Sequence, residues 1–283
     1  MDLREKLIVR PGSSIKLSHV DASFHGHFSS QEDASSEMTR NLAKLDELQQ
    51  KLYAEKKHAV LVVLQGIDAA GKDGTCWHVL SAMNPQGTAV TGFKTPTPEE
   101  SRHDFLWRIH RHVPELGTVG VFNRSHYEDV LVVRVHDLAP REVWSRRYDQ
   151  INAFEESLAL QNVTILKFFL YITPEEQLER FRRRLDDPAR QWKISDADYK
   201  ERSFWDQYIE AYEAMLEKCS TAHAPWYVIP SNHKWFRNLA VSQILENTLL
   251  DLKMELPKPT VDLEQIRREY HSAAKSPSHP ESK

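Results

Sequence analysis

The hydrophobic pattern alternates between short apolar runs and longer amphipathic stretches along most of the chain. The run at residues 59–65 (AVLVVLQ) is continuous and rich in valine, and the run at 163–172 has the same character. Continuous short runs of this kind are typical of strands that are buried on both faces. Weaker runs at 88–91, 118–122 and 225–229 bring the expected number of strands to five.

Stretches with apolar residues at helical spacing separate these strands. We expect helices at 39–57, about 72–83, 98–112, 140–161, 203–218 and 234–255. Proline fits the first turn of a helix, so Pro140 and Pro174 indicate two helix starts. Strands that alternate with helices predict an α/β fold, with a five-stranded parallel sheet sandwiched by helices.

The chain divides into a central domain and two ends. We expect residues 1–35, which are polar and serine-rich, to form an N-terminal arm that is extended or poorly ordered. No linker divides residues 36–256, so they form one domain. Residues 257–283 form a tail, and its Ser-, Pro- and His-rich end, from residue 271, is expected to be disordered.

Composition excludes several classes of protein. The 283 residues are 40% hydrophobic and 28% charged, which is typical of a globular domain. No apolar run reaches the roughly 18 residues of a membrane helix, and no signal-peptide pattern is visible. Cys76 and Cys219 are too few for a disulfide framework, and the net charge of −4 lacks the basic excess of nucleic-acid-binding domains. We therefore expect a cytoplasmic protein without membrane or nucleic-acid partners.

The most specific pattern is the segment from Gly66 to Lys72 (GIDAAGK), which fits the phosphate-loop motif GxxxxGK. Residue frequencies predict roughly 0.02 chance matches in this chain. Backbone N–H groups of such a loop and of the helix after it bind phosphate oxygens, and the lysine adds a positive charge. The alternative is a simple glycine turn. The predicted phosphate-binding residues here are Gly66, Ala69, Ala70, Gly71, Lys72, Asp73, Gly74 and Thr75.

Two acids distinguish this loop from the standard pattern. Asp73 follows Lys72, where Ser or Thr normally supplies a ligand to magnesium. Asp68 lies inside the loop, where a carboxylate beside phosphates is costly unless a cation lies between them. Asp68 is therefore predicted to bind Mg²⁺ or to orient the attacking oxygen. The alternative is an aspartate that only caps the helix.

A second group of polar residues follows the predicted strand at 118–122. Ligands of open parallel sheets bind at the carboxyl ends of strands. Arg124 can there stabilise charge on a transferred group or hold an acceptor phosphate. Glu128 or Asp129 is a further candidate for metal binding or base catalysis. For His126 we favour a hydrogen-bonded histidine beside the site over a nucleophile.

The third motif is a run of cations at residues 180–195 that surrounds Pro188. Arg180, Arg183 and Arg184 share one face of a helix. A basic segment between two helices suits a lid, at about 180–202, that closes over phosphates and excludes water. The alternative is a solvated basic helix end. The predicted phosphate-binding residues of this segment are Arg180, Arg184, Arg190 and Lys193.

The three motifs together resemble the second family of polyphosphate kinases over about residues 25–255. The family loop GxDxxGKxG matches Gly66, Asp68, Gly71, Lys72 and Gly74. Its strand-end motif, Asp-Arg-Ser followed by an aromatic residue and Tyr, corresponds to Asn123, Arg124, Ser125, His126 and Tyr127. Its lid RFxxR…P…WKxS matches Arg180, Phe181, Arg184, Pro188, Trp192, Lys193 and Ser195. The version NRSHYED is similar to the subgroup that accepts both AMP and ADP.

This resemblance implies a P-loop kinase fold and reversible phosphoryl transfer from inorganic polyphosphate to AMP or ADP, with Mg²⁺ as cofactor. It also implies a homo-oligomer, such as a tetramer. The implied catalytic residues are Asp68, Lys72, Arg124 and Arg184. The implied nucleotide-binding residues are Asn123, Arg124, Tyr127, Glu128 and Arg134. Asn123 replaces the family aspartate, so Asp68 is the leading metal ligand, with Asp129 or Glu128 as a further candidate.

Two other functions remain open from the sequence. An ATP-donor nucleotide kinase of the thymidylate-kinase type shares the loop, the strand-end arginine and a basic lid. A non-enzymatic nucleotide-binding switch normally keeps Ser or Thr after the loop lysine and has less need of a lid. Asp73 and the arginine-rich segment therefore count against the switch.

Overall fold

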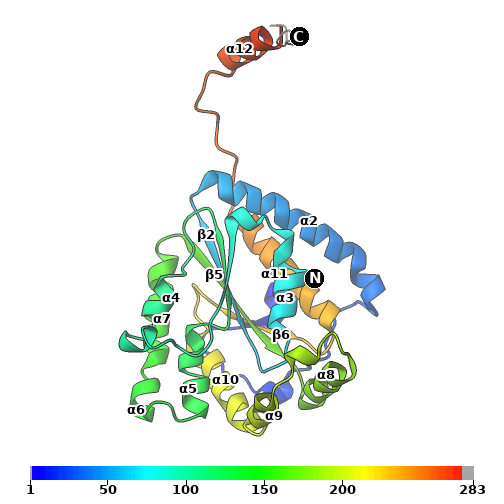
Figure 1. The fold of residues 1–283 in the computed structure, drawn as a ribbon, viewed down its shortest axis with the longest axis vertical. Coiled ribbons are helices and arrows are strands. Elements are labelled where there is room, and N and C mark those ends of the chain that lie inside the picture. The colour runs from blue at the N-terminus through cyan, green and yellow to red at the C-terminus, as the bar shows by residue number, and fades with distance from the viewer. Residues whose placement is uncertain (1, 276–283) are drawn as a thin grey trace, which may run out of the picture.

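Six strands form one sheet in the computed structural model, which describes residues 2–275 (Figure 1). The strands are β1 (Ile8–Val9), β2 (Ala59–Gln65), β3 (Thr88–Gly92), β4 (Val119–Asn123), β5 (Val163–Tyr171) and β6 (Trp226–Pro230). Their spatial order is β1-β6-β5-β2-β4-β3. Strands β2 to β6 are parallel, as expected, and β1 pairs with β6 in the antiparallel direction. The predicted α/β class is confirmed, but the sheet has six strands instead of five.

Helices cover both faces of this sheet. One face packs against α1 (Leu3–Leu7), α2 (Gln31–Glu55), α3 (Lys72–His78) and α11 (Lys234–Asp251). The other packs against α4 (Trp107–His110), α5 (Val132–Val135), α6 (Arg141–Trp144), α7 (Arg147–Ala159) and α10 (Trp205–Cys219). Beyond the carboxyl ends of the strands lie α8 (Pro174–Asp186) and α9 (Asp196–Arg202) (Figure 1). Short 3₁₀ helices are η1 (Leu17–His19), η2 (Leu80–Ala82), η3 (Pro85–Gly87), η4 (Glu100–Arg102), η5 (His126–Asp129) and η6 (Gln191–Lys193).

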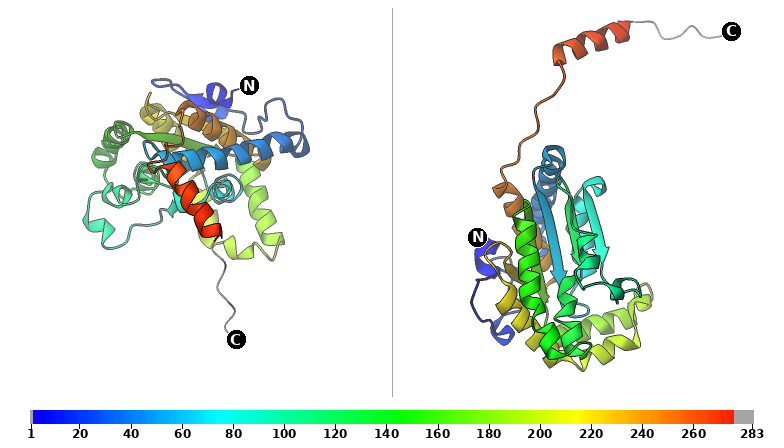
Figure 2. Two further views of the ribbon diagram at one scale, coloured as in Figure 1. Left: turned by 90° about the horizontal axis from the view of Figure 1, so that it is seen from above. Right: turned by 90° about the vertical axis from the view of Figure 1, so that its left-hand side faces the viewer.

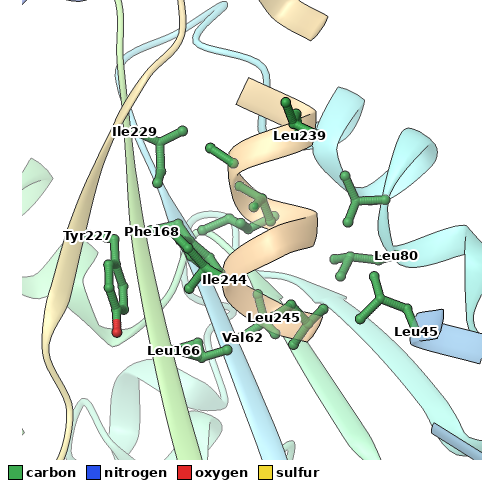
Figure 3. Close-up of a cluster of buried hydrophobic side chains, with 14 of the residues drawn as sticks. Leu45, Val62, Leu80, Leu166, Phe168, Tyr227, Ile229, Leu239, Ile244 and Leu245 are labelled. Atoms are coloured by element: carbon green, nitrogen blue, oxygen red, sulfur yellow. The ribbon is translucent and has the colours of Figure 1, made fainter. Parts of the chain in front are cut away.

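The central strand β2 shows why its sequence is apolar throughout. Its seven residues are all buried. Side chains of a strand alternate between the two faces, so Val60, Val62 and Leu64 join one core and Leu61 and Val63 join the other. Figure 3 shows the first of these cores, where α11 packs over β2, β5 and β6. Burial on both faces therefore replaces the polar–apolar alternation of a half-exposed strand.

The N-terminal residues differ from the expected arm. Leu3 and Leu7 of α1 pack into the core beneath α11, and Val9 and Leu17 pack on the other face of the sheet. Val9 belongs to the short strand β1 at the edge of the sheet. These residues are therefore part of the packed body, and a two-residue strand is too short to produce a periodic signal.

The expected helix at 98–112 is largely wrong. Only η4 and the four-residue α4 form there. The side chains of Asp104 and Glu100 accept hydrogen bonds from the backbone N–H groups of Leu106 and Thr97, respectively, and such bonds favour turns over a continuous helix. The expected helix at 140–161 is divided into α6 and α7, and the one at 72–83 ends at His78. The other expected helices differ from the observed ones chiefly at their ends.

The C-terminal segment lies apart from the body. Figures 1 and 2 show α12 (Leu263–Lys275) at the end of an extended segment, and residues 271–275 of the expected disordered tail are helical. The rest of that prediction, at 276–283, lies outside the described residues. Within residues 2–275, no helix has the length and apolar character needed to cross a bilayer.

Candidate active site

The phosphate-loop motif lies at the carboxyl end of the central strand. The strand β2 has β4 on one side and β5 on the other, so the chain changes direction across the sheet at this point. Open α/β sheets bind ligands in the crevice formed at such a switch. The loop connects β2 to α3 and contains two left-handed residues, Ala69 (φ 65°) and Gly71 (φ 113°). This geometry matches the strand–loop–helix context expected from the motif.

A cavity of about 990 Å³ extends from this loop. It is lined by the loop, the end of β4, the segment from α8 to α9, the start of α11 and the first half of α2. Its lining contains nine cations: Lys72, Arg124, Arg180, Arg183, Arg184, Arg190, Lys193, Lys234 and Arg237. Its acids are Asp68, Asp73 and Asp198. We call it the cationic cavity, because its cations outnumber its acids. Its charge is therefore opposite in sign to the chain's net charge of −4. Such a cavity attracts a multiply charged anion.

The lysine of the motif lies at the entrance of α3. The side chain of Lys72 is buried, and its Nζ donates to the carbonyl of Gly66 at 2.6 Å. Burial lowers the pKa of Lys72, and the nearby charge of Arg124 lowers it further, against the opposing effect of the neighbouring acids. An anionic ligand would offset both effects, because it would supply the missing negative charge.

The strand-end motif brings its arginine onto the loop. Arg124 follows β4 with a positive φ of 61°, a conformation that is costly for a residue with a Cβ and that is enriched at functional sites. Its Nη2 donates to Oδ1 of Asp68 at 2.9 Å. Beside it, Nδ2 of Asn123 donates to Oδ1 of Asp73 at 2.7 Å. The second motif therefore positions both acids of the loop.

The two acids after Arg124 have different surroundings. A carboxylate oxygen of Glu128 lies 3.8 Å from Nη1 of Arg124, and burial raises the pKa of Glu128 despite the charges of Arg124 and Lys72. Asp129 accepts from Nη1 of Arg147 at 2.8 Å, and burial raises its pKa to about 6. Neither Glu128 nor Asp129 is part of the lining of the cationic cavity, so the structure gives no support to the predicted metal role of either.

The arginine-rich segment has one member that serves the loop itself. Arg180 is buried and donates to the carbonyls of Ala69 and Ala70 from Nη1, at 2.8 and 2.9 Å. Its Nη2 donates to the carbonyls of Ser231 and Asn232, and its Nε to Glu176. All five N–H groups of this guanidinium are therefore used by the protein. Arg180 holds the loop in place, and the predicted direct contact with polyphosphate does not fit this arrangement.

The other predicted cations of this segment remain closer to the cavity. Arg184 lies 3.5 Å from a carboxylate oxygen of Asp198, and Arg190 pairs with Asp187 at 2.8 Å. Lys193 extends over the ring of Trp192. All three cations line the cationic cavity, Arg184 from the end of α8 and the other two from η6 and the residue before it.

Several predicted binding residues do not line the cavity. Gly66 is required by packing, because a Cβ there would lie 2.7 Å from the carbonyl oxygen of Leu170. Ala70 and Thr75 are fully buried, and the Thr75 hydroxyl donates to the carbonyl of Gly71, so neither side chain faces the cavity. Arg134 packs over Trp144, away from the cavity.

Tyr127 was predicted to bind the nucleotide, and the structure contradicts this. Its side chain is fully buried, and its hydroxyl donates to Glu155 at 2.8 Å. His126 is also buried and lies 3.1 Å from the same carboxylate, as a structural histidine should. Lys167 completes this cluster through Glu155. His126 and Tyr127 therefore anchor the end of β4 to this buried cluster.

The prediction from sequence missed Lys234 and Arg237, which line the cationic cavity from α11. A signal for them was present. Helix N-termini favour acidic side chains, yet the first turn of α11 has no acid and begins with a lysine. Cations at that end of a helix are unfavourable unless an anion compensates them.

The comparisons with known proteins agree with this geometry. Residues 28–257 match the model of the family described as polyphosphate kinase 2. The chain belongs to the polyphosphate kinase 2 family. A relative named AMP/ADP-polyphosphate phosphotransferase, from Meiothermus ruber, is 47% identical over 93% of this chain and 98% of its own. A relative named ADP-polyphosphate phosphotransferase, from Rhodopseudomonas palustris, is 42% identical over 89% of this chain and 91% of its own.

A solved structure of the family has the same fold. The crystal structure of polyphosphate kinase 2 from Arthrobacter aurescens TC1 superimposes with a TM-score of 0.92 at 44% identity, over 96% of this chain and 97% of that one. The predicted family and the P-loop kinase fold are thus confirmed. Membership of the polyphosphate kinase 2 family also makes this chain a polyphosphate:nucleotide phosphotransferase by class, and it removes the non-enzymatic switch from consideration.

Proposed function

We propose that this protein transfers the terminal phosphoryl group of inorganic polyphosphate to AMP and to ADP, reversibly. A terminal phosphate oxygen of the nucleotide forms the new P–O bond. The bond to the next phosphate of the chain breaks, and the shortened polyphosphate keeps the bridging oxygen and its electron pair. The observation that carries the proposal is the excess of cations in the cationic cavity. The name of the relative from Meiothermus ruber supports both acceptors, and that of the relative from Rhodopseudomonas palustris supports ADP.

The protein's part in this reaction is positioning and charge neutralisation, because phosphoryl transfer needs little covalent help. Backbone N–H groups of the loop and the ammonium of Lys72 hold phosphates. Arg124, held against Asp68, is placed to face the charge that develops on the transferred group. We propose the segment 180–202 as a lid whose Arg184, Arg190 and Lys193 close over the donor.

Mg²⁺ is the proposed cofactor, and the residues present fit it in a shared mode. Within residues 2–275, no three His, Cys, Asp or Glu side chains form a metal-binding group. Magnesium commonly uses one or two carboxylates together with substrate phosphates. Asp68 and Asp73 both line the cationic cavity and supply such carboxylates. When bound, Mg²⁺ would neutralise phosphate charge.

Asp68 is the more informative of these two acids to change. We expect Asp68→Asn to reduce turnover by about 10²-fold or more and to raise the Mg²⁺ concentration needed for half-maximal rate, while nucleotide binding is largely kept. Rates measured across a Mg²⁺ titration test this. The structure shows no side-chain cap on α3, so an unchanged rate and an unchanged Mg²⁺ dependence would mean that Asp68 only pairs with Arg124.

A nucleotide panel with long-chain polyphosphate as the sole donor tests the function. We expect ADP from AMP and ATP from ADP, without any added nucleoside triphosphate. If phosphoryl transfer needs ATP as donor, the thymidylate-kinase type of activity is correct instead. The expected homo-oligomer, such as a tetramer, is checked in the same preparation by light scattering coupled to size exclusion.

A further inference from the structure

Arg237 is a buried cation whose charge the described protein does not balance. Its side chain is 2% exposed, and no carboxylate lies within ion-pairing distance of it in residues 2–275. Its Nε and Nη2 donate to Oδ1 of Asn238, at 3.1 and 2.8 Å, and its Nη1 to the carbonyl of Ala70 at 3.4 Å. A guanidinium has five N–H groups, so two of them find no acceptor in that part of the chain.

The glycines of the phosphate loop make room for this guanidinium. A Cβ on Gly71 would lie 1.7 Å from Nη1 of Arg237, and a Cβ on Gly74 would lie 2.9 Å from Nη2. The guanidinium therefore lies directly against the turn that leads into α3, where backbone N–H groups of a phosphate loop face their ligand. The loop and α11 fit together around Arg237 and leave it facing the cationic cavity.

The surroundings of Arg237 increase the imbalance. Arg180 is a close cation, and burial beside it lowers the pKa of Arg237 to about 9. Lys234, one turn earlier on α11, has no ion pair in the described residues and has its pKa lowered by burial and by Arg180. An isolated buried charge is costly, and proteins retain one where a ligand compensates it.

We propose that Arg237, together with Lys234, forms an anion subsite on the α11 side of the phosphate loop that holds a non-transferred phosphate of the polyphosphate donor. This inference rests on the proposed function. Arg124 reaches the loop from β4, whereas Arg237 reaches it from α11, so the two cations approach the bound phosphates from different elements. A polyphosphate donor is negatively charged along its chain, so different phosphates of one donor can bind Arg124 and Arg237.

Kinetics of matched variants test the subsite. Arg237→Met removes the charge and keeps an unbranched side chain, and Arg237→Lys restores the charge. The control is Arg267→Met, because Arg267 is an exposed cation of α12 that pairs with Glu264, outside both the cavity lining and the proposed lid. We expect Arg237→Met to raise the KM for polyphosphate about tenfold or more and to change the KM for ADP less than about twofold. Arg237→Lys should recover part of the loss, and Arg267→Met should resemble the wild type.

Thermal unfolding separates the subsite from a structural role. Tripolyphosphate is the probe, and calorimetry gives its affinity directly. We expect Arg237→Met to keep or raise the Tm without ligand, since it removes an uncompensated charge, and to lose most of the Tm increase caused by tripolyphosphate. A lower Tm without ligand combined with an unchanged KM for polyphosphate would overturn the proposal.

Two further arms keep the test decisive. If Arg237→Met does not fold, Arg237→Gln keeps hydrogen-bonding groups without the charge, and wild-type affinity of this variant for tripolyphosphate would overturn the subsite. The wild type with polyphosphate as sole donor reports on the proposed function alone. A wild type that binds tripolyphosphate through Arg237 but makes no ATP from ADP would disprove the function and leave the anion subsite standing.

Discussion

Two buried cations lie on opposite faces of the sheet and have opposite surroundings. Lys167 of β5 is fully buried beneath α7, and its Nζ contacts a carboxylate oxygen of Glu155, the hydroxyl of Tyr127 and the carbonyl of Cys219. Arg237 of α11 is equally buried and has neutral acceptors alone in the described residues. Burial of a charge is tolerated when its partners are present. The charge of Lys167 is compensated within the protein, and that of Arg237 is not.

This difference shows how the strand-end motif is built. Glu155 binds Lys167 and also holds His126 and Tyr127, so the second motif is anchored to the paired cluster. Arg124, two residues before His126, faces the loop instead. One short segment therefore links the compensated charges under the sheet to the uncompensated charges in the cationic cavity, and variants on each side should affect different properties.

The largest expected effect comes from breaking the compensated pair. Lys167→Met leaves the carboxylate of Glu155 buried without its cation, which typically costs about 3–5 kcal/mol of the free energy of unfolding. Chemical denaturation of the variant and of the wild type measures the loss. The double variant Lys167→Met with Glu155→Gln should recover part of it. A loss below about 1 kcal/mol would mean that the cluster is less important to stability than its geometry indicates.

The second prediction concerns the phosphate loop, where we expect lost turnover and unchanged stability. Lys72→Met should reduce turnover by at least about 10²-fold, because the charge that neutralises phosphate is lost. The free energy of unfolding should be kept, since Lys72 has no carboxylate partner within ion-pairing distance in the described residues and its pKa is already lowered by burial. Steady-state rates and denaturation curves of the same preparation check both parts. Near-normal turnover of a folded variant would disprove the assignment of this loop.

The smallest expected effect lies at the lid, where the cations are partly exposed. Arg184→Ala should raise the KM for polyphosphate and lower kcat, each by a few-fold, with less effect on ADP, because a lid arginine contacts charge that moves in the transition state. The effect should shrink at higher salt, since exposed charges are screened over about 10 Å at 0.1 M. Kinetics at two ionic strengths, with Arg184→Lys as the control, test this. Weaker binding of ADP alone would favour a nucleotide lid and an ATP donor.

The sequence by itself determined the parts of this protein that depend on local pattern. Continuous valine-rich runs predicted β2 and β5, because a strand covered on both faces excludes polar residues. The segment from Gly66 to Lys72 predicted the phosphate loop, because a chance match to the GxxxxGK motif is rare. Together with the arginine-rich segment, these features were sufficient to predict the family, which the match over residues 28–257 confirms.

Only the tertiary structure decided what each side chain faces. Arg180 and Arg237 are both arginines on helices, yet one has all of its N–H groups used by carbonyls and Glu176 and the other faces the cationic cavity. Tyr127 lies within the strand-end motif but packs with Lys167 from a later strand. These partners are distant in sequence, and burial and hydrogen bonding are properties of the packed chain. A local pattern therefore specifies that a residue is present, and the packing of distant segments specifies its role.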